Sequence, residues 1–206
     1  MLIQYSKILE NCVNEVAKLP GIGKRSALRI VLDLVKKDAG ELTLLTDAIQ
    51  KLHEELKICS VCYNLSDEAI CSICADPKRD QTTICVVQDI RDVIAIENTQ
   101  QYRGVYHVLG GVISPMDGIG PQQIRVQELV NRVSESKPVE VLLALPATPE
   151  GDTTNYYIYK SIKDWVSKIT TLARGVGINE ELEYTDPVTL SRSLLTRTDI
   201  EQTFIK

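Results

Sequence analysis

The chain has 206 residues, of which 44% are hydrophobic, enough apolar material for one or two packed domains. It contains no run of about 18 apolar residues, which excludes a membrane span, and its opening residues, MLIQYSKILE, lack the basic-then-apolar order of a signal peptide. We therefore expect a cytoplasmic protein without membrane contact, in a compartment that keeps thiols reduced.

The formal net charge is −5, the wrong sign for a surface that binds phosphate everywhere. The cations are concentrated near one end, because the twenty residues from 18 to 37 contain six cations and a single anion, Asp33. These cations are Lys18, Lys24, Arg25, Arg29, Lys36 and Lys37. Binding to a polyanion is therefore expected to be local to this segment and steeply salt-dependent.

Apolar residues at helical spacing predict three helices in the first third of the chain, over 5–18, from about Lys24 onward, and over 41–57. Pro20 and Gly21 end the first helix. The short connection Leu19-Pro20-Gly21-Ile22-Gly23 then leads directly into the basic second helix.

This connection has the properties of a phosphate-binding hairpin. Gly21 and Gly23 allow a tight turn and a close approach of the backbone to a ligand, and the following helix offers free N–H groups and its positive dipole end. Lys24 and Arg25 add cations, and Arg29 follows one turn later. The string LPGIGKRSALRI, with Ala27 and Ile30 expected to pack the two helices together, is similar to the helix-hairpin-helix motif, which binds the sugar–phosphate backbone without reading bases.

The candidate DNA-binding residues are therefore Gly21, Gly23, Lys24, Arg25 and Arg29. The alternative is an ordinary connection between two helices with solvated lysines. One motif of this type is usually half of a symmetric pair, which suggests a dimer or a larger assembly.

Four cysteines form a CxxC-x8-CxxC cluster: Cys59, Cys62, Cys71 and Cys74. Two residues between cysteines let both thiolates reach one tetrahedral ion, and two such pairs close the coordination shell, so a structural zinc ion is expected. The polar segment between the pairs would take its folding energy from that ion. A redox dithiol or two disulfides are the alternatives.

Other residues of the metal-binding types carry weaker signals. Cys12 and Cys85 lie on apolar faces and are expected in the core. His53 is expected at the surface and His107 within a strand.

After Lys78 strands and helices alternate, which predicts parallel βαβ units and a covered sheet. Strands are expected at 83–87, 105–109, 139–145 and 169–173, and helices around 93–96, over 122–135 and over 152–166. The segment 110–121 is a glycine-rich loop that lacks the Gly-Lys-Ser/Thr ending of a nucleotide-binding loop. The tail, 176–206, is expected to be irregular with a short helix near 188–195.

With these motifs in this order, the chain resembles the RecR family of bacterial recombination mediators over essentially all 206 residues. The resemblance also rests on Cys85-Val86-Val87, Gly110-Gly111-Val112-Ile113-Ser114-Pro115 with Asp117-Gly118-Ile119-Gly120-Pro121, Glu150-Gly151-Asp152-Thr153-Thr154, Arg174-Gly175, Glu181-Leu182-Glu183-Tyr184 and Thr189-Leu190. It implies an α/β multidomain protein with a helix-hairpin-helix domain (1–56), a four-cysteine zinc finger (57–77), a Toprim domain (78–175) and a C-terminal oligomerisation segment (176–206).

The resemblance also implies a function. Such a protein is a non-catalytic, ring-like DNA clamp that acts with RecO, and in some contexts RecF, to load recombinase at single-stranded gaps. It is expected to be a homo-oligomer, a dimer or a tetramer, in the cytoplasm at the nucleoid.

The acidic positions of the Toprim domain depart from those of catalytic relatives. Topoisomerases and primases of this type use a glutamate after the first strand and acidic residues after the third to hold Mg²⁺. Here Gln88 replaces the glutamate, and Pro146 stiffens the loop before Glu150 and Asp152. These two carboxylates are candidate contacts for a partner protein, and the alternative ligand that they could share is a Mg²⁺ ion. Their alternative explanation is favourable charge at a helix N-terminus.

Three functions follow from these residues. The leading hypothesis is the DNA-repair mediator without enzymatic activity. The alternatives are a Mg²⁺-dependent Toprim nuclease or primase-like enzyme, supported by Glu150 and Asp152, and a scaffold that binds only proteins.

Overall fold

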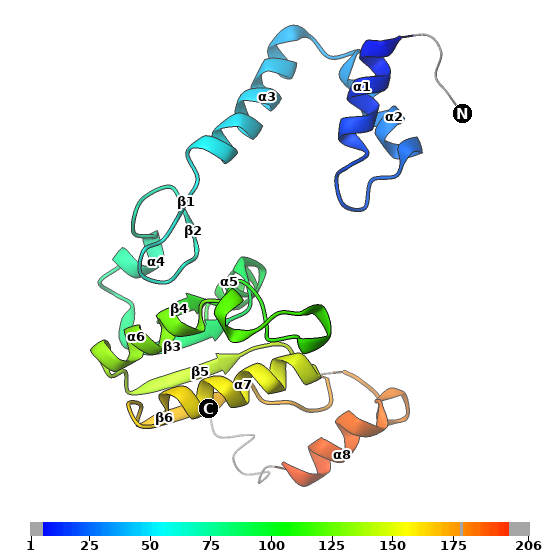
Figure 1. Ribbon diagram of the computed structural model, residues 1–206. Coiled ribbons are helices and arrows are strands. Elements are labelled where there is room, and N and C mark those ends of the chain that lie inside the picture. The colour runs from blue at the N-terminus through cyan, green and yellow to red at the C-terminus, as the bar shows by residue number, and fades with distance from the viewer. Residues whose placement is uncertain (1–5, 178, 198–206) are drawn as a thin grey trace. The chain divides into compact units, whose positions relative to one another are not determined.

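A computed structural model describes residues 6–177 and 179–197 of the chain (Figure 1). The chain divides into two compact units, Met1–Leu56 and Lys57–Lys206. None of the described helices is long and apolar enough to cross a membrane.

The first unit contains the helices α1 (Lys7–Val16), α2 (Lys24–Leu34) and α3 (Ala39–Glu54). The side chains of Ser6 and Asp38 cap α1 and α3 by accepting a hydrogen bond from a backbone N–H of the first turn. α1 and α2 pack through a small core in which Val13, Ala27 and Val31 are buried. The α3 helix buries none of its residues, and its apolar side chains Leu42, Leu44, Leu45, Ile49 and Leu52 are exposed.

Two packing predictions in this unit are wrong. Cys12 is exposed rather than buried, because the contact stripe of α1 consists of Leu9, Val13, Val16 and Ala17, and Cys12 lies beside it. Ile30 is 40% exposed and does not join the core, whereas Ala27, three residues earlier, is fully buried between the helices as predicted. A pair of short helices has room for only one buried stripe on each.

The second unit begins with the four-cysteine segment. Two short antiparallel strands, β1 (Lys57–Ile58) and β2 (Leu65–Ser66), are followed by the one-turn helix α4 (Ser72–Ala75). The sequence predicted the cysteine cluster but not these three short elements, because segments of two to four residues carry no readable periodicity.

A four-stranded parallel sheet follows, built from β3 (Asp80–Val87), β4 (Gly104–Val108), β5 (Glu140–Ala144) and β6 (Lys168–Thr171) in the order β4-β3-β5-β6. The helices that connect the strands are α5 (Ile90–Asn98), α6 (Val126–Ser136) and α7 (Pro149–Ile162). Two 3-10 turns, η1 (Pro115–Asp117) and η2 (Pro121–Gln123), lie in the long loop after β4. The chain continues through η3 (Leu182–Tyr184) into α8 (Pro187–Leu195).

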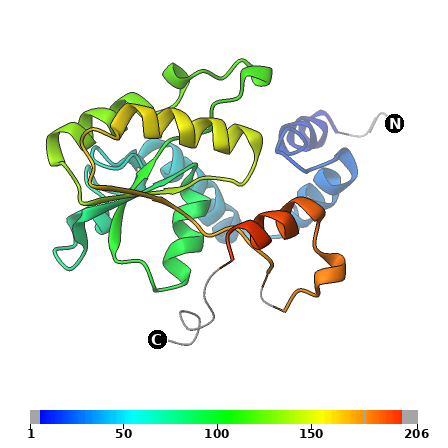
Figure 2. The same ribbon diagram turned by 90° about the horizontal axis from the view of Figure 1, so that it is seen from below.

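Helices cover both faces of this sheet, as Figure 2 shows with α7 on one side and α5 on the other. Ile84 and Val86 point to the face covered by α6 and α7, where Leu129, Val133, Ile158 and Ile162 are buried. Cys85 and Val87 point to the opposite face, against Val93 of α5. This alternation along β3 accounts for the continuous apolar run in the sequence, since both faces of the strand are buried.

The predicted α/β fold is confirmed, and the strands and helices deviate from their predicted ends by a few residues. The α7 helix starts at Pro149 rather than Asp152, because the Thr148 hydroxyl accepts a hydrogen bond from Gly151 N at 3.2 Å and Pro149 occupies the first helical position. Cys85 is buried and His53 is exposed, as expected. His107 lies in β4 and is completely buried.

Gly151 fixes the start of α7 against the loop after β5. A Cβ at this position would lie 2.0 Å from the carbonyl oxygen of Pro146. We predict that Gly151→Ala destabilises the second unit by about 1–3 kcal/mol, because α7 or the loop must shift to remove the overlap. Urea unfolding followed by the fluorescence of Trp165, the single tryptophan of the chain, measures this change.

Gly120→Ala is the matched control, since its Cβ would lie 3.7 Å from the nearest atom and its φ is −95°. It should change the free energy of unfolding by less than about 0.5 kcal/mol. Equal stability of the two variants would contradict the role assigned to Gly151.

Candidate nucleic-acid interface and metal centre

The hairpin between α1 and α2 takes its shape from one glycine. Gly21 has a φ of +78°, a left-handed conformation that strongly favours glycine. Ile22 turns back into the small core and donates its N–H to Leu19 O at 3.1 Å. Gly23 precedes α2 in an ordinary extended conformation, and a Cβ added to it would meet no atom within 4 Å, so the fold itself does not require glycine there.

The N-terminus of α2 has no internal counter-charge or cap. No side chain of residues 6–177 or 179–197 caps it, and its first turn contains no acidic residue. The other described α-helices have either a capping side chain or an acidic residue in the first turn. The N–H groups of Lys24, Arg25 and Ser26 find no hydrogen-bond partner among the described residues. They therefore form a solvent-facing group of donors at the positive end of a helix dipole.

Three cations lie in the first two turns of α2, which carry these donors. Lys24, Arg25 and Arg29 are exposed and form no ion pair within the described part of the chain. By contrast, Lys18 pairs with Glu15 at 2.7 Å and Lys37 pairs with Glu41 at 3.1 Å. The predicted DNA-binding residues therefore lie together on the hairpin and the first two turns of α2, and their charge is free for a ligand.

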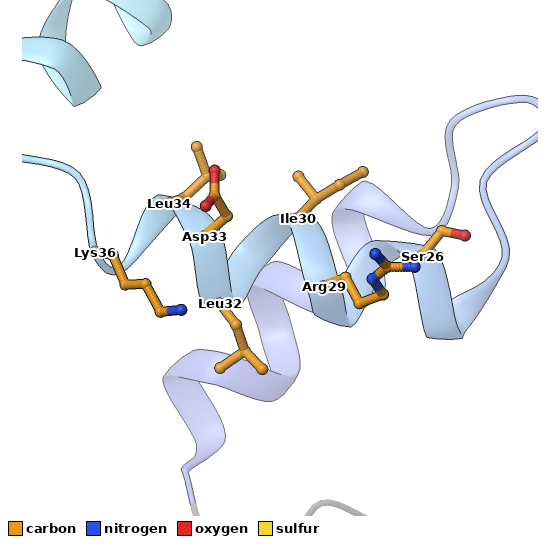
Figure 3. A pocket seen from close by; sticks show the side chains of 7 residues that line it. All are labelled: Ser26, Arg29, Ile30, Leu32, Asp33, Leu34 and Lys36. Atoms are coloured by element: carbon orange, nitrogen blue, oxygen red, sulfur yellow. The ribbon is translucent and has the colours of Figure 1, made fainter.

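A shallow hollow of about 640 Å³ lies along α2 (Figure 3). Arg29 and Ser26 border it at the hairpin end, and Lys36 borders it at the other end. Ile30 and Leu34 project from the same side of the helix in Figure 3, which explains why Ile30 does not reach the core between α1 and α2.

The four predicted zinc ligands converge at one point. The Sγ atoms of Cys59, Cys62, Cys71 and Cys74 all lie within 4.8 Å of one another, and those of Cys62 and Cys71 are 3.5 Å apart. Zn–S bonds of about 2.3 Å in a tetrahedron place the sulfurs about 3.8 Å apart, so the cluster fits one zinc ion. Four protein ligands leave no position for water, and the ion is structural. The described residues contain no second group of this kind.

The surroundings of the cluster control the charge of its thiols. Burial opposes ionisation of Cys59, but main-chain N–H groups, chiefly that of Cys71 at 3.3 Å from its sulfur, lower its pKa to about 6. Burial raises the pKa of Cys71 to about 11. The ligands must lose protons to bind zinc, so zinc binding releases protons and low pH releases zinc.

The zinc finger is attached to the edge strand β4. Val108 N donates a hydrogen bond to Cys62 O at 2.8 Å. The next residue, Tyr63, has a φ of +64° and lies between two groups of the α/β domain. Its ring is 5.3 Å from that of His107 and 4.5 Å from the guanidinium of Arg125. The finger and the loop that ends at Arg125 therefore meet at the Tyr63 ring.

His107, a residue of β4 whose ring lies against that of Tyr63, is a neutral side chain. Its Nε2 is 2.9 Å from Arg125 O, and burial lowers its pKa to about 4. The sequence identified His107 only as a strand residue, and it provided no signal for Tyr63 or Arg125, because their contacts join segments about 40 to 60 positions apart.

The positions at which catalytic Toprim domains carry acidic residues lie at the carboxyl edge of the sheet. Gln88 follows β3, and its backbone carbonyl accepts a hydrogen bond from Gly110 N at 2.9 Å. Glu150 and Asp152 lie in the first turn of α7, where carboxylates are favourable. Asp152 contacts Arg174 at 2.6 Å and Arg192 at 3.8 Å, and the hydrogen bond from Arg174 lowers its pKa. Neither arginine was predicted to pair with it.

The glycine-rich loop after β4 is held by turns rather than shaped for a phosphate. Gly110 and Gly118 have φ values of +80° and +72°, as the need for sharp turns predicts. Ile113 N donates to the buried hydroxyl of Thr154 at 2.8 Å, which fastens the loop to α7.

We predict that Cys71→Ser reduces the zinc content from one ion per chain to near zero. Hydrogen exchange should then accelerate at Val108 N, whose acceptor is Cys62 O, while Val86 in the centre of the sheet stays protected. Metal analysis and hydrogen-exchange mass spectrometry measure both effects. Cys12→Ser, at an exposed cysteine outside the cluster, should keep the zinc. Zinc retained by Cys71→Ser would contradict the assignment.

Comparison with known families covers almost the whole chain. The RecR helix-hairpin-helix model matches residues 9–53, and the RecR zinc finger model, which is defined by four cysteines, matches residues 56–76. The Toprim domain model matches residues 82–173, and the RecR C-terminal model matches residues 175–198. The first two models contain the hairpin and the cysteine cluster described above.

Curated relatives agree over nearly their full length. A recombination protein RecR from Flavobacterium johnsoniae is 52% identical over 199 residues, which are 97% of this chain and 97% of that protein. One from Bacteroides fragilis is 54% identical over 95% of this chain and 96% of its own. One from Porphyromonas gingivalis is 48% identical over 97% of each. The chain therefore belongs to the RecR family of recombination proteins, with a helix-hairpin-helix, a four-cysteine zinc finger and a Toprim domain in that order.

Proposed function

We propose that this recombination-repair protein binds DNA without sequence preference through the hairpin at the start of α2. The observation that supports the proposal is the uncapped N-terminus of α2, where free main-chain N–H groups lie beside Lys24, Arg25 and Arg29. Main-chain donors and flexible cations contact phosphate oxygens, which are the same at every nucleotide. The complex should therefore depend on salt much more than on sequence.

The Toprim domain, in our proposal, carries out no catalysis. Gln88 cannot exchange a proton at the position where catalytic relatives have glutamate. Asp152, one of the two remaining acids, is occupied by Arg174 and Arg192. A divalent ion would have to displace two guanidinium groups from this carboxylate, so Mg²⁺ binding is disfavoured.

We further propose that the chain acts as a ring-like homo-oligomer with RecO and RecF to load recombinase at single-stranded gaps, in the cytoplasm at the nucleoid. The membership of the chain in the RecR family motivates this proposal. The row of exposed apolar residues on α3 supports self-association, because an amphipathic helix with no buried residue gains stability from a second surface. Glu150, which forms no ion pair within the described residues, is more available to a partner protein than Asp152.

The hairpin proposal predicts the effect of a double substitution. Lys24→Ala with Arg25→Ala should weaken DNA binding at least tenfold at moderate salt and lower the slope of log affinity against log salt by about 2. Folding and oligomeric mass should not change, because both side chains are exposed and unpaired among the described residues. Fluorescence anisotropy with two duplexes of unrelated sequence measures the affinity.

Lys36→Ala with Lys37→Ala is the control, since it removes two cations just beyond the opposite end of α2, of which Lys37 is paired with Glu41. It should weaken binding much less than the hairpin variant. Wild-type affinity of the hairpin variant, or equal losses in the two variants, would refute the proposal.

The rival function is a Mg²⁺-dependent nuclease or primase-like enzyme. We expect no cleavage or synthesis when the purified protein is incubated with labelled DNA, nucleotides and Mg²⁺, and the same result for Asp152→Asn. Reproducible turnover that Asp152→Asn abolishes would establish the enzyme instead.

A further inference from the structure

We propose that a hollow between α7, β6 and α8 binds single-stranded nucleic acid by stacking unpaired bases on tyrosine side chains. This site belongs to the second unit and shares no residue with the hairpin. It extends the proposed function from backbone binding at α2 to base contacts on the Toprim domain.

The hollow has a volume of about 1250 Å³, larger than a typical small-molecule pocket and therefore large enough for an extended ligand. One wall is a stripe along α7 formed by Asp152, Asn155, Tyr156 and Tyr159. These positions lie three or four residues apart and therefore share one face of the helix. The opposite walls come from the end of β6 with the segment that follows, and from α8.

Two aromatic rings are available on this face. Tyr156 and Tyr159 are 62% and 45% exposed, and neither belongs to the packed clusters of the sheet. Large exposed aromatic side chains beside cations are characteristic of surfaces that bind single strands, because every base has a flat face to stack. Bases in a duplex are already stacked and paired, so a duplex cannot use these rings.

Cations placed around the rings match a phosphate backbone. Among the described residues that line the hollow, Arg174, Arg192 and Arg197 are cationic and Asp152 is the single acid. Arg174 forms an ion pair with Asp152 at 2.6 Å. Arg192 is 3.8 Å from the same carboxylate, so its N–H groups remain available to a ligand. Lys160 lies 5.2 Å from the centre of the Tyr156 ring and adds a further positive charge at the rim. The hollow is thus cationic on a protein whose net charge is −5.

One polar atom in the wall lacks a partner. The side-chain Oδ1 of Asn155 is buried and finds no hydrogen bond among the described residues. A buried acceptor without a donor is unfavourable. Because this atom is buried, the N–H donor of an unpaired base reaches it only after the side chains that cover it move.

The test uses the full-length protein with Tyr156→Leu and Tyr159→Leu combined. Leucine keeps the side chains apolar but removes the flat rings. Fluorescence anisotropy with a labelled oligothymidylate should show at least tenfold weaker binding, while a duplex of equal length should bind within twofold of the wild type. Tyr157→Leu is the matched control, since Tyr157 is 42% exposed on the same helix but does not line the hollow. It should change neither affinity.

The results separate this proposal from the hairpin proposal. Loss of Lys24 and Arg25 should weaken both single strands and duplexes, because both present phosphates, whereas loss of the two tyrosines should weaken single strands alone. Wild-type binding of oligothymidylate by the double leucine variant would overturn the inference. Equal weakening for both nucleic acids would do so as well.

A second copy of the chain is the alternative occupant of the hollow. In that case the double variant would change the oligomeric mass measured by light scattering and leave the affinity for oligothymidylate unchanged, which would also overturn the inference. Tyr156→Leu alone keeps the test valid if the double variant misfolds, since a side chain with 62% exposure contributes little to folding. It should weaken oligothymidylate binding about fivefold.

Discussion

The N-terminus of α2 is the constraint on which the account of this protein depends. The first N–H groups of a helix need acceptors, and elsewhere in the described chain side chains or nearby acidic residues meet this need. At α2 the turn at Gly21 and the extended Gly23 leave the donors in solvent, beside Lys24 and Arg25. A polyanion can accept hydrogen bonds from these free N–H groups and neutralise the nearby positive charge at the same time. This geometry therefore favours binding over catalysis.

The second unit shows how a Toprim fold can be retained while one of its acids, Asp152, pairs with arginines of the same chain. The carboxylate of Asp152 connects α7 to the segment after β6 and to α8 through Arg174 and Arg192, so it contributes to the arrangement of the C-terminal segment. The four-cysteine cluster is connected to the same domain near the start of this unit, through Cys62 O, Tyr63 and the edge strand β4. Asp152, a candidate metal ligand in the sequence, and Cys62, a zinc ligand, therefore also connect separate segments of the second unit.

Local patterns explain which features could be predicted from the sequence. The zinc ligands depend on short spacings, and β3, β4 and β5 contain largely apolar runs that are buried, so both features were predicted correctly. The turn at Gly21 follows from the glycine itself. The errors concern burial and distant contacts. Helical spacing placed Cys12 and Ile30 on apolar faces, but two short helices bury only one stripe on each. The pairing of Asp152 with Arg174 and Arg192, and of Tyr63 with Arg125, depends on tertiary packing that no local spacing encodes.

Backbone amide chemical shifts, followed by NMR during titration with short DNA duplexes, test the central claim most directly. The account predicts that the largest perturbations occur at Gly21 and Gly23–Ser26, with the same pattern for duplexes of unrelated sequence and with a decrease as salt is raised. Binding that leaves these amides unperturbed, or a pattern that changes with the base sequence, would contradict it.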